Sequence, residues 1–252
     1  MKATAWEFRY RLWISCAIIV LGFAAPWIEV LNLGNREVHT WGWLAVSLGR
    51  LGLPMLSGFE LVAALAIAAA AIATLLRVSG TAYLGAGTVF NAEMKAGADE
   101  PTAGVMADGP YRYMRNPLYA GSFLTVAALA VLMPPSGAAV SLVLLGIFLV
   151  RLILGEEAFL APRLGESYAA YCRAVPRLLP SLRARVGASR QLPNWKRALL
   201  GEIFPSGVLL SFAALSWQYN PDLLAKAVLI SFGLSLVVRG FIVPNGIPSQ
   251  TA

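Results

Sequence analysis

The chain has few charged residues, a single histidine and two cysteines. Charged residues make up 13% of its 252 residues, whereas they make up about a quarter of an ordinary soluble domain. Cys16 lies in an apolar run and Cys172 in a basic segment, so we expect no disulfide between them and no cysteine metal site. With His39 as its only histidine, the sequence has no ligand spacing typical of a bound metal.

Apolar runs dominate the rest of the sequence. Hydrophobic residues account for 58% of it, and the mean hydropathy is +0.67. An α-helix needs about 20 apolar residues to cross about 30 Å of hydrocarbon, and shorter runs suffice where flanking side chains snorkel. The candidate runs cover residues 12–28, 58–76, 118–133, 137–154, 198–217 and 222–243. We therefore predict an all-α, polytopic membrane protein with about six transmembrane helices.

Turn-forming residues indicate how these runs are connected. The third and fourth runs share the turn Pro134–Gly137, which predicts a tight helical hairpin, and the short connection Gln218–Pro221 predicts a second one. Basic residues before the first run resemble a secretion signal, but no small-residue cleavage site follows, so we expect an uncleaved helix. We expect the fourth helix to continue to about Ala161 and a second short helix to begin at Pro162.

The net charge of +7 is unevenly distributed among the loops. Lysines and arginines precede the first run and lie between the second and third and between the fourth and fifth, whereas the alternate loops hold little more than Arg36, Arg50 and Lys226. Basic residues favour the cytoplasmic side, which predicts cytoplasmic termini and places His39 on the opposite side. We expect residues 183–197 to contact anionic lipid headgroups. Nucleic acid is not an expected partner, because no aromatic-interleaved soluble domain accompanies these residues.

The most informative stretch is the motif at residues 109–119, which reads Gly-Pro-Tyr-Arg-Tyr-Met-Arg-Asn-Pro-Leu-Tyr and leads into the third apolar run. Its tyrosines and arginines place polar recognition groups at the start of a membrane helix. Pro117 biases Asn116 toward an extended conformation and suits the first helical turn, where backbone N–H groups can bind an anionic group. Glu156 and Glu157 lie at the end of the fourth run, the second helix of the predicted hairpin. We expect them to complete a site with the motif at the start of the first helix.

This motif resembles the signature of the integral-membrane methyltransferases related to isoprenylcysteine carboxyl methyltransferase and phospholipid N-methyltransferase. The family pattern reads Gly-x-Tyr, Arg-His-Pro-x-Tyr, a hydrophobic hairpin, Glu-Glu, and a Gly-x-x-Tyr-x-x-Tyr tail that ends in Val-Pro. The matching residues are Tyr111, Arg115, Pro117, Tyr119, Glu156, Glu157, Gly165, Tyr168, Tyr171, Val175 and Pro176. Asn116 stands where the family usually has histidine, and asparagine cannot titrate near neutral pH.

The resemblance covers roughly residues 56–180 and divides the chain into three parts. Residues 1–55 form an N-terminal helix with an interfacial segment, residues 56–180 a methyltransferase-like membrane core, and residues 181–252 a basic linker with a C-terminal hairpin. The resemblance implies S-adenosylmethionine as the cofactor, bound at a cytosol-facing site at the end of the helical hairpin.

By resemblance, a set of residues around the motif and in the preceding loop binds this cofactor. The set comprises Ala103, Gly104, Val105, Met106, Tyr111, Arg115, Asn116, Pro117, Leu118, Tyr119, Glu156 and Glu157. The candidate catalytic residues are Arg115, Asn116 and Glu156. These residue types suit the ligand, because arginine can hold its carboxylate, a carboxylate can hold its ammonium or ribose hydroxyls, and tyrosine rings can hold its adenine and cationic sulfur.

The expected function is methyl transfer to a lipophilic or small membrane-permeant acceptor, in contact with membrane lipids and in a bacterial inner membrane. A thiol or carboxylate is favoured, because no imidazole is available to deprotonate an amine, although an amine headgroup stays open. Related carboxyl-methylating enzymes have an arginine where this chain has Leu152, which puts a thiol slightly ahead. The alternatives are an NADPH-dependent membrane enzyme like the sterol reductases and a non-catalytic membrane assembly factor on the same scaffold.

Overall fold

The computed structural model describes residues 2–24, 39–84, 108–188 and 192–242. Within these ranges the chain is helical and contains no strand, which confirms the predicted all-α class. The elements in chain order are α1 (Ala5–Arg9), α2 (Arg11–Ala24), α3 (Thr40–Arg50), α4 (Met55–Tyr83), η3 (Gly109–Arg112), α5 (Pro117–Leu129), η4 (Ala130–Leu132), α6 (Pro135–Ala174), α7 (Trp195–Gly201), α8 (Ile203–Leu215), η5 (Ser216–Gln218) and α9 (Pro221–Ile242). Ala103, Gly104, Val105 and Met106, which were predicted to bind the cofactor, lie outside the described residues.

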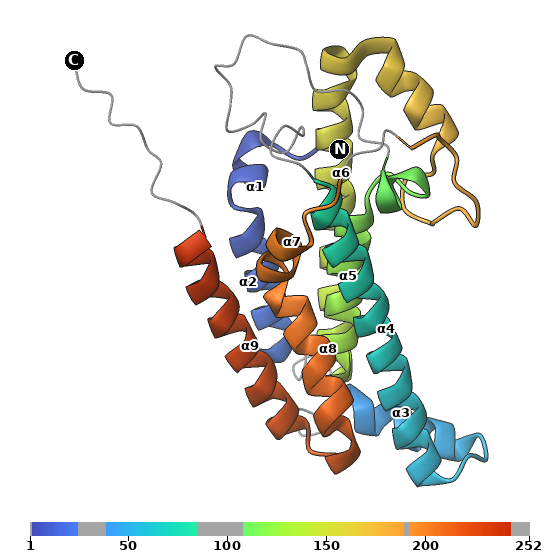
Figure 1. Cartoon of the computed structure of the whole chain (residues 1–252). Coiled ribbons are helices and arrows are strands. Elements are labelled where there is room, and N and C mark those ends of the chain that lie inside the picture. Colours follow the sequence, from blue (N-terminus) through green and yellow to red (C-terminus); the bar gives the residue numbers. More distant parts are fainter. Residues whose placement is uncertain (1, 25–38, 85–107, 189–191, 243–252) are drawn as a thin grey trace.

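Each predicted apolar run overlaps one or more helices, although the run 198–217 covers both α7 and α8, and residues 25–28 and 243 lie outside the described residues. By length and composition, α4, α6 and residues 221–238 of α9 can each cross a membrane. The pair of α7 and the helix from Ile203 to Gln218, bent by 70°, makes a fourth span if it counts as one. α2 and the segment Pro117–Leu132 are apolar but shorter. The helices form an elongated bundle, and α6 extends beyond its neighbours at one end (Figure 1).

α5 and α6 form the first predicted hairpin. η4 and Pro134 make the turn, and Pro135 occupies the first position of α6, where a missing N–H costs no hydrogen bond. Tyr119 and Val126 of α5 pack against Leu145, Phe148, Leu149, Leu152 and Ile153 of α6 and against Ile18 of α2. From Pro135 to Glu156 the helix rises about 30 Å. We call the end of the bundle that carries Glu156 and residues 108–119 the motif end.

α6 continues past Pro162, so the prediction that a new helix begins there is wrong. The break lies three residues later at Gly165, whose φ of 55° and ψ of −138° are non-helical. Proline removes one helical N–H donor, but the chain changes direction at the glycine, which adopts a positive φ without the steric cost of a Cβ. Beyond this break the last part of α6 folds over at the motif end (Figure 1).

α4 packs closely against α5 through small residues. A Cβ at Gly80 of α4 would lie 2.8 Å from Cδ2 of Leu118, and a Cβ at Gly121 of α5 would lie 2.5 Å from Cγ of Arg77. A side chain at Gly80 would displace the end of the Leu118 side chain, whereas one at Gly121 would also press on the Ala73 carbonyl oxygen at 3.0 Å, so the close approach depends most on Gly121. Small residues allow membrane helices to approach in this way.

α3 lies at the end of the bundle opposite the motif end (Figure 1). The backbone N–H and the hydroxyl of Thr40 both donate to the Met133 carbonyl, at 2.8 and 2.7 Å. His39, the N-cap of α3, therefore lies beside the turn of the α5–α6 hairpin and far from Glu156.

α8 and α9 form the second predicted hairpin, which turns at Tyr219 with a φ of 52°. Val208 and Phe212 of α8 and Leu224 of α9 belong to the same buried cluster as Val62 and Ala66 of α4. The C-terminal hairpin is thereby packed against the core of the bundle.

Candidate functional site

Two segments far apart in the sequence run side by side at the motif end: residues 112–115 and residues 176–185. Backbone N–H groups bond across them at 2.8–2.9 Å, from Arg115 to Pro176, from Ser181 to Tyr113 and from Arg185 to Arg112. The Arg112 guanidinium adds a bond to the Val186 carbonyl at 3.0 Å. The chain that follows α6 is thus fastened to the motif that precedes α5.

Glu157 binds two arginines. Its Oε1 accepts a hydrogen bond from Nη1 of Arg115 at 2.8 Å, and Arg177 donates to both carboxylate oxygens at 2.8–3.2 Å. The Glu157 side chain is only 14% exposed, and the two cationic partners stabilise its charge there. The hydrogen bond to Glu157 raises the pKa of Arg177. Glu157 therefore joins the motif to the segment that follows α6.

Glu156 reaches the partner helix of the hairpin instead. Its Oε2 accepts a hydrogen bond from the Tyr119 hydroxyl at 2.9 Å. Successive residues of an α-helix are rotated by about 100°, which explains why Glu156 and Glu157 have different partners. Tyr119 lies in the first turn of α5 and is buried, so this contact closes the mouth of the hairpin.

Tyr111 is buried in the η3 turn that precedes α5. Gly109 supports this turn with a φ of 55°, and its missing side chain lets the backbone pack against the ring of Tyr83. The Tyr171 hydroxyl, near the end of α6, donates to the Tyr111 carbonyl at 2.8 Å. The position of Tyr111 is therefore fixed from both α4 and α6.

Two buried polar atoms at this site have no hydrogen-bond partner in the described part of the chain: the Tyr111 hydroxyl and Nε of Arg115. Buried polar groups in native proteins are nearly always hydrogen-bonded. Burial raises the pKa of Tyr111 well above its ordinary value, and the charge of Glu156 adds to this effect. Tyr111 therefore keeps its proton, so its hydroxyl can donate a hydrogen bond, as Nε of Arg115 always can. The site suits a polar ligand with acceptor atoms.

Asn116 is the N-cap of α5, but its side chain does not cap the helix. Its Nδ2 instead donates to the Arg177 carbonyl at 3.1 Å. Pro117 follows as the first residue of α5 and is buried. Asn116 thus supports the same cross-link between the motif and the segment after α6 as Glu157 does.

The structure brings most of the predicted site residues together at the motif end. Arg177 is the residue that sequence reasoning missed, because it looked like one more basic residue of the linker. In the sequence, Arg177 is distinguished from the other basic residues only by its position directly after the Val175-Pro176 pair that ends the motif tail. Arg151, one turn before Gly155, does not reach this site: it forms an ion pair with Glu7 of α1 at 2.9 Å.

Comparison with known proteins gives one match. Residues 60–167 match the model of the phospholipid methyltransferase family, which confirms the resemblance inferred from the motif. A search of the curated proteins and a search of the solved structures found no match.

Proposed function

We propose that this integral membrane protein, whose residues 60–167 belong to the phospholipid methyltransferase family, transfers a methyl group from S-adenosylmethionine to a lipophilic acceptor at the motif end. The proposal depends on two buried donors, the Tyr111 hydroxyl and Arg115 Nε, which have no hydrogen-bond partner in the described part of the chain. Neighbouring polar groups of the site are hydrogen-bonded. The two donors lie in the matched segment, and the glutamate pair completes the site from across the hairpin.

The residues present fit the donor molecule. Arg115 offers its Nε to the carboxylate, while its Nη1 stays bound to Glu157. Glu156 offers an anionic partner for the ammonium group or the ribose hydroxyls. The rings of Tyr111 and Tyr119 offer aromatic faces to the adenine and the sulfonium. When bound, the donor supplies an electrophilic methyl group whose carbon–sulfur bond breaks as the acceptor lone pair attacks, and sulfur keeps the bonding electrons.

The chain itself holds the reactants and excludes water, which is the main contribution a protein makes to an in-line displacement. The Glu157 contacts to Arg115 and Arg177 fix the motif in place, and the Tyr119–Glu156 bond closes the hairpin above the apolar core. These contacts hold the site residues in defined positions, which limits the rearrangement needed to orient donor and acceptor.

A thiol is the favoured acceptor group, because its ordinary pKa of about 8.5 lets it lose its proton to water and react as the thiolate. Carboxyl-methylating members of the family have an arginine where this chain has Leu152, which is buried in the hairpin core. The neighbouring Arg151 forms an ion pair with Glu7. Neither residue therefore supports a carboxylate acceptor. An ammonium group with a pKa near 10 needs a base, and the only histidine lies beside the far turn of the hairpin. The acceptor enters from the bilayer, because the site adjoins the apolar surface of a helical bundle.

The test is methyl transfer from radiolabelled S-adenosylmethionine by the purified protein in lipid vesicles. The acceptor panel contains hydrophobic thiols, prenylcysteine analogues and aminophospholipids. Label on the thiols supports the proposal. Label confined to the aminophospholipids would overturn the choice of acceptor, and absence of label on every acceptor would overturn the enzymatic activity. Glu166→Gln, which changes an exposed carboxylate of α6, is the matched control for Glu156→Gln and should behave as the wild type.

A further inference from the structure

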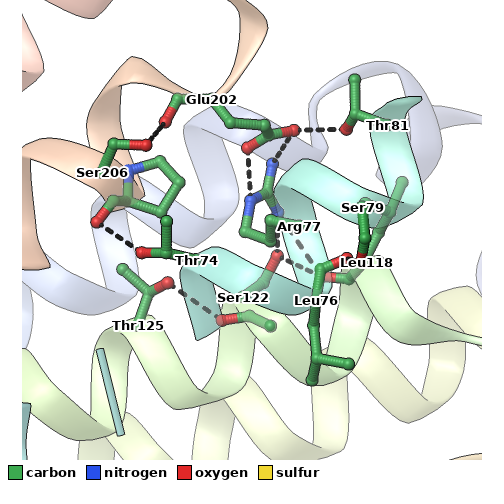
Figure 2. Close-up of polar contacts among 12 residues, drawn as sticks. Thr74, Leu76, Arg77, Ser79, Thr81, Leu118, Ser122, Thr125, Glu202 and Ser206 are labelled. Atoms are coloured by element: carbon green, nitrogen blue, oxygen red, sulfur yellow. Dashed lines mark hydrogen bonds and ion pairs between the residues drawn. The ribbon is translucent and has the colours of Figure 1, made fainter. Parts of the chain in front are cut away.

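Another charged pair lies near the motif end, where the chain entering the C-terminal hairpin meets α4 (Figure 2). Arg77 of α4 is bound to Glu202, at the break between α7 and α8, through Nε–Oε2 at 2.6 Å and Nη2–Oε1 at 3.1 Å. Thr81 also donates to Glu202, at 2.7 Å. The Glu202 side chain is 5% exposed and that of Arg77 20%. Charges in such surroundings are tolerated only when they are paired.

Arg77 uses its remaining nitrogen to bind α5. Its Nη1 donates to Oγ of Ser122 at 2.5 Å and approaches the Leu118 carbonyl at 3.4 Å, while Ser122 donates to that same carbonyl at 2.9 Å. Leu118 directly precedes Tyr119, whose hydroxyl binds Glu156. The carboxylate of Glu202 is therefore linked, through one guanidinium, to the first turn of the helix that carries the donor site.

A second connection runs from the same part of the C-terminal segment to the η3 turn. The Asn194 N–H donates to the Ala82 carbonyl at 2.8 Å, and the ring of Trp195 meets that of Tyr83 edge-on, with centroids 6.3 Å apart. Tyr83 in turn packs against Gly109 in the turn that presents Tyr111. Residues 194–202 thus support both tyrosines of the donor site, although they lie outside the matched segment 60–167.

Docking of the hairpin does not by itself account for the buried pair. One turn before Arg77, Thr74 already donates to the Pro205 carbonyl at 3.0 Å, and Val208 and Phe212 bury apolar surface against α4. Apolar residues of similar volume often stabilise a protein as well as a buried ion pair does. The ion pair contributes something that apolar packing lacks, namely a fixed bond from Arg77 to the first turn of α5.

We propose that Arg77 and Glu202 are positioning residues of the methyl-donor site, and that residues 194–202, which lead into the C-terminal hairpin, contribute to that site. The inference rests on the proposed function. Arg77 orients the first turn of α5, and Glu202 orients Arg77. The charges of both residues also affect the pKa of buried Tyr111: the charge of Arg77 lowers it, and that of Glu202 raises it.

The test uses the double variant Arg77→Met/Glu202→Leu, which replaces the whole ion pair with apolar side chains. Detergent-purified protein is titrated calorimetrically with adenosylhomocysteine, and its thermal unfolding is measured in parallel. We expect an unfolding temperature close to that of the wild type but a Kd raised by about tenfold or more, because positioning is lost without loss of packing. Thr74→Val, which removes a bond between the same helices without touching α5, is the matched control and should leave Kd unchanged.

Ser122→Ala is the second variant, because it keeps the ion pair and removes the shorter of the two contacts that Nη1 of Arg77 makes with α5, leaving the one to the Leu118 carbonyl at 3.4 Å. It should raise Kd by about threefold. The inference fails if the double variant folds and binds like the wild type, or if Ser122→Ala leaves Kd unchanged. Absence of binding to the wild-type protein itself would remove the donor site and the proposed function, which is a different result from wild-type binding that the variants leave intact.

Discussion

The Tyr119 hydroxyl of α5 donates a hydrogen bond to Glu156 of α6 at 2.9 Å, which closes the mouth of the hairpin. The two residues are separated by 37 positions in the sequence, and the turn between them lies about 30 Å away along α6. This contact forms only if the apolar faces of both helices pack in register. The candidate site is therefore a direct product of the packing of the hairpin core.

Neutralising Glu156 is expected to weaken donor binding. Glu156→Gln keeps the shape of the side chain but removes the charge that holds an ammonium group or ribose hydroxyls. Loss of a charge-assisted hydrogen bond costs about 1.5–3 kcal/mol, so Kd for adenosylhomocysteine should rise roughly ten- to a hundred-fold. Glu157→Gln should weaken binding as well, because Arg115 and Arg177 lose their shared anionic partner. Unchanged affinity in both single variants and in the double variant contradicts this placement of the cofactor.

Gly121→Ala is expected to destabilise the protein, because α4 and α5 approach too closely for a side chain at this position. The added Cβ would lie 2.5 Å from Cγ of Arg77 and 3.0 Å from the Ala73 carbonyl oxygen. Overpacking of this kind costs about 1–3 kcal/mol and should lower the thermal unfolding temperature in detergent. Gly233→Ala is the control, since its new Cβ would meet nothing within 4 Å beyond its chain neighbours and the backbone of its own helix. Equal unfolding temperatures for the two variants would show that the close approach of α4 and α5 is wrong.

The Glu7–Arg151 pair predicts a pH-dependent contribution to stability. The hydrogen bonds from Arg151, and then from the Thr4 backbone, lower the pKa of Glu7 from 4.5 to about 2. A lowered folded-state pKa stabilises the folded protein above pH 4.5, and this stabilisation disappears as the pH falls toward about 2. The unfolding temperature of the wild type should exceed that of Glu7→Gln at pH 7, and the difference should shrink below pH 4.5. A difference that stays constant from pH 7 to pH 3 is incompatible with the pair.

The distribution of basic residues predicts that the two ends of the α5–α6 hairpin face opposite sides of the membrane. Ser181 is bonded to Tyr113 at the motif end, and Pro135 begins α6 at the other end. Single cysteines at these positions, in a chain whose two native cysteines are replaced by serine, should be labelled from opposite sides of sealed vesicles, with Ser181→Cys on the cytoplasmic side. Labelling of both from one side would show that the hairpin does not span the bilayer.

The sequence predicts the parts of this molecule that depend on local composition. Length and hydropathy locate the helices, the Pro134-Pro135 pair locates the hairpin turn, and the motif indicates that Tyr119 and the glutamate pair lie at the same end of the hairpin. The break in α6 was misplaced at Pro162, because a proline is a stronger local signal than Gly165, whose positive φ is set by the folded structure. The Arg77–Glu202 and Glu157–Arg177 pairs could not be predicted, since nothing in the local sequence says which distant charge each one meets.

The methyl-donor site at the motif end can be tested by isothermal titration of the detergent-purified wild-type protein with adenosylhomocysteine. We expect saturable binding at one site per chain, weakened in Glu156→Gln and unchanged in Glu166→Gln. A titration of the folded wild-type protein that shows no binding, or binding that Glu156→Gln and Glu157→Gln together leave intact, would contradict a methyl-donor site at the motif end.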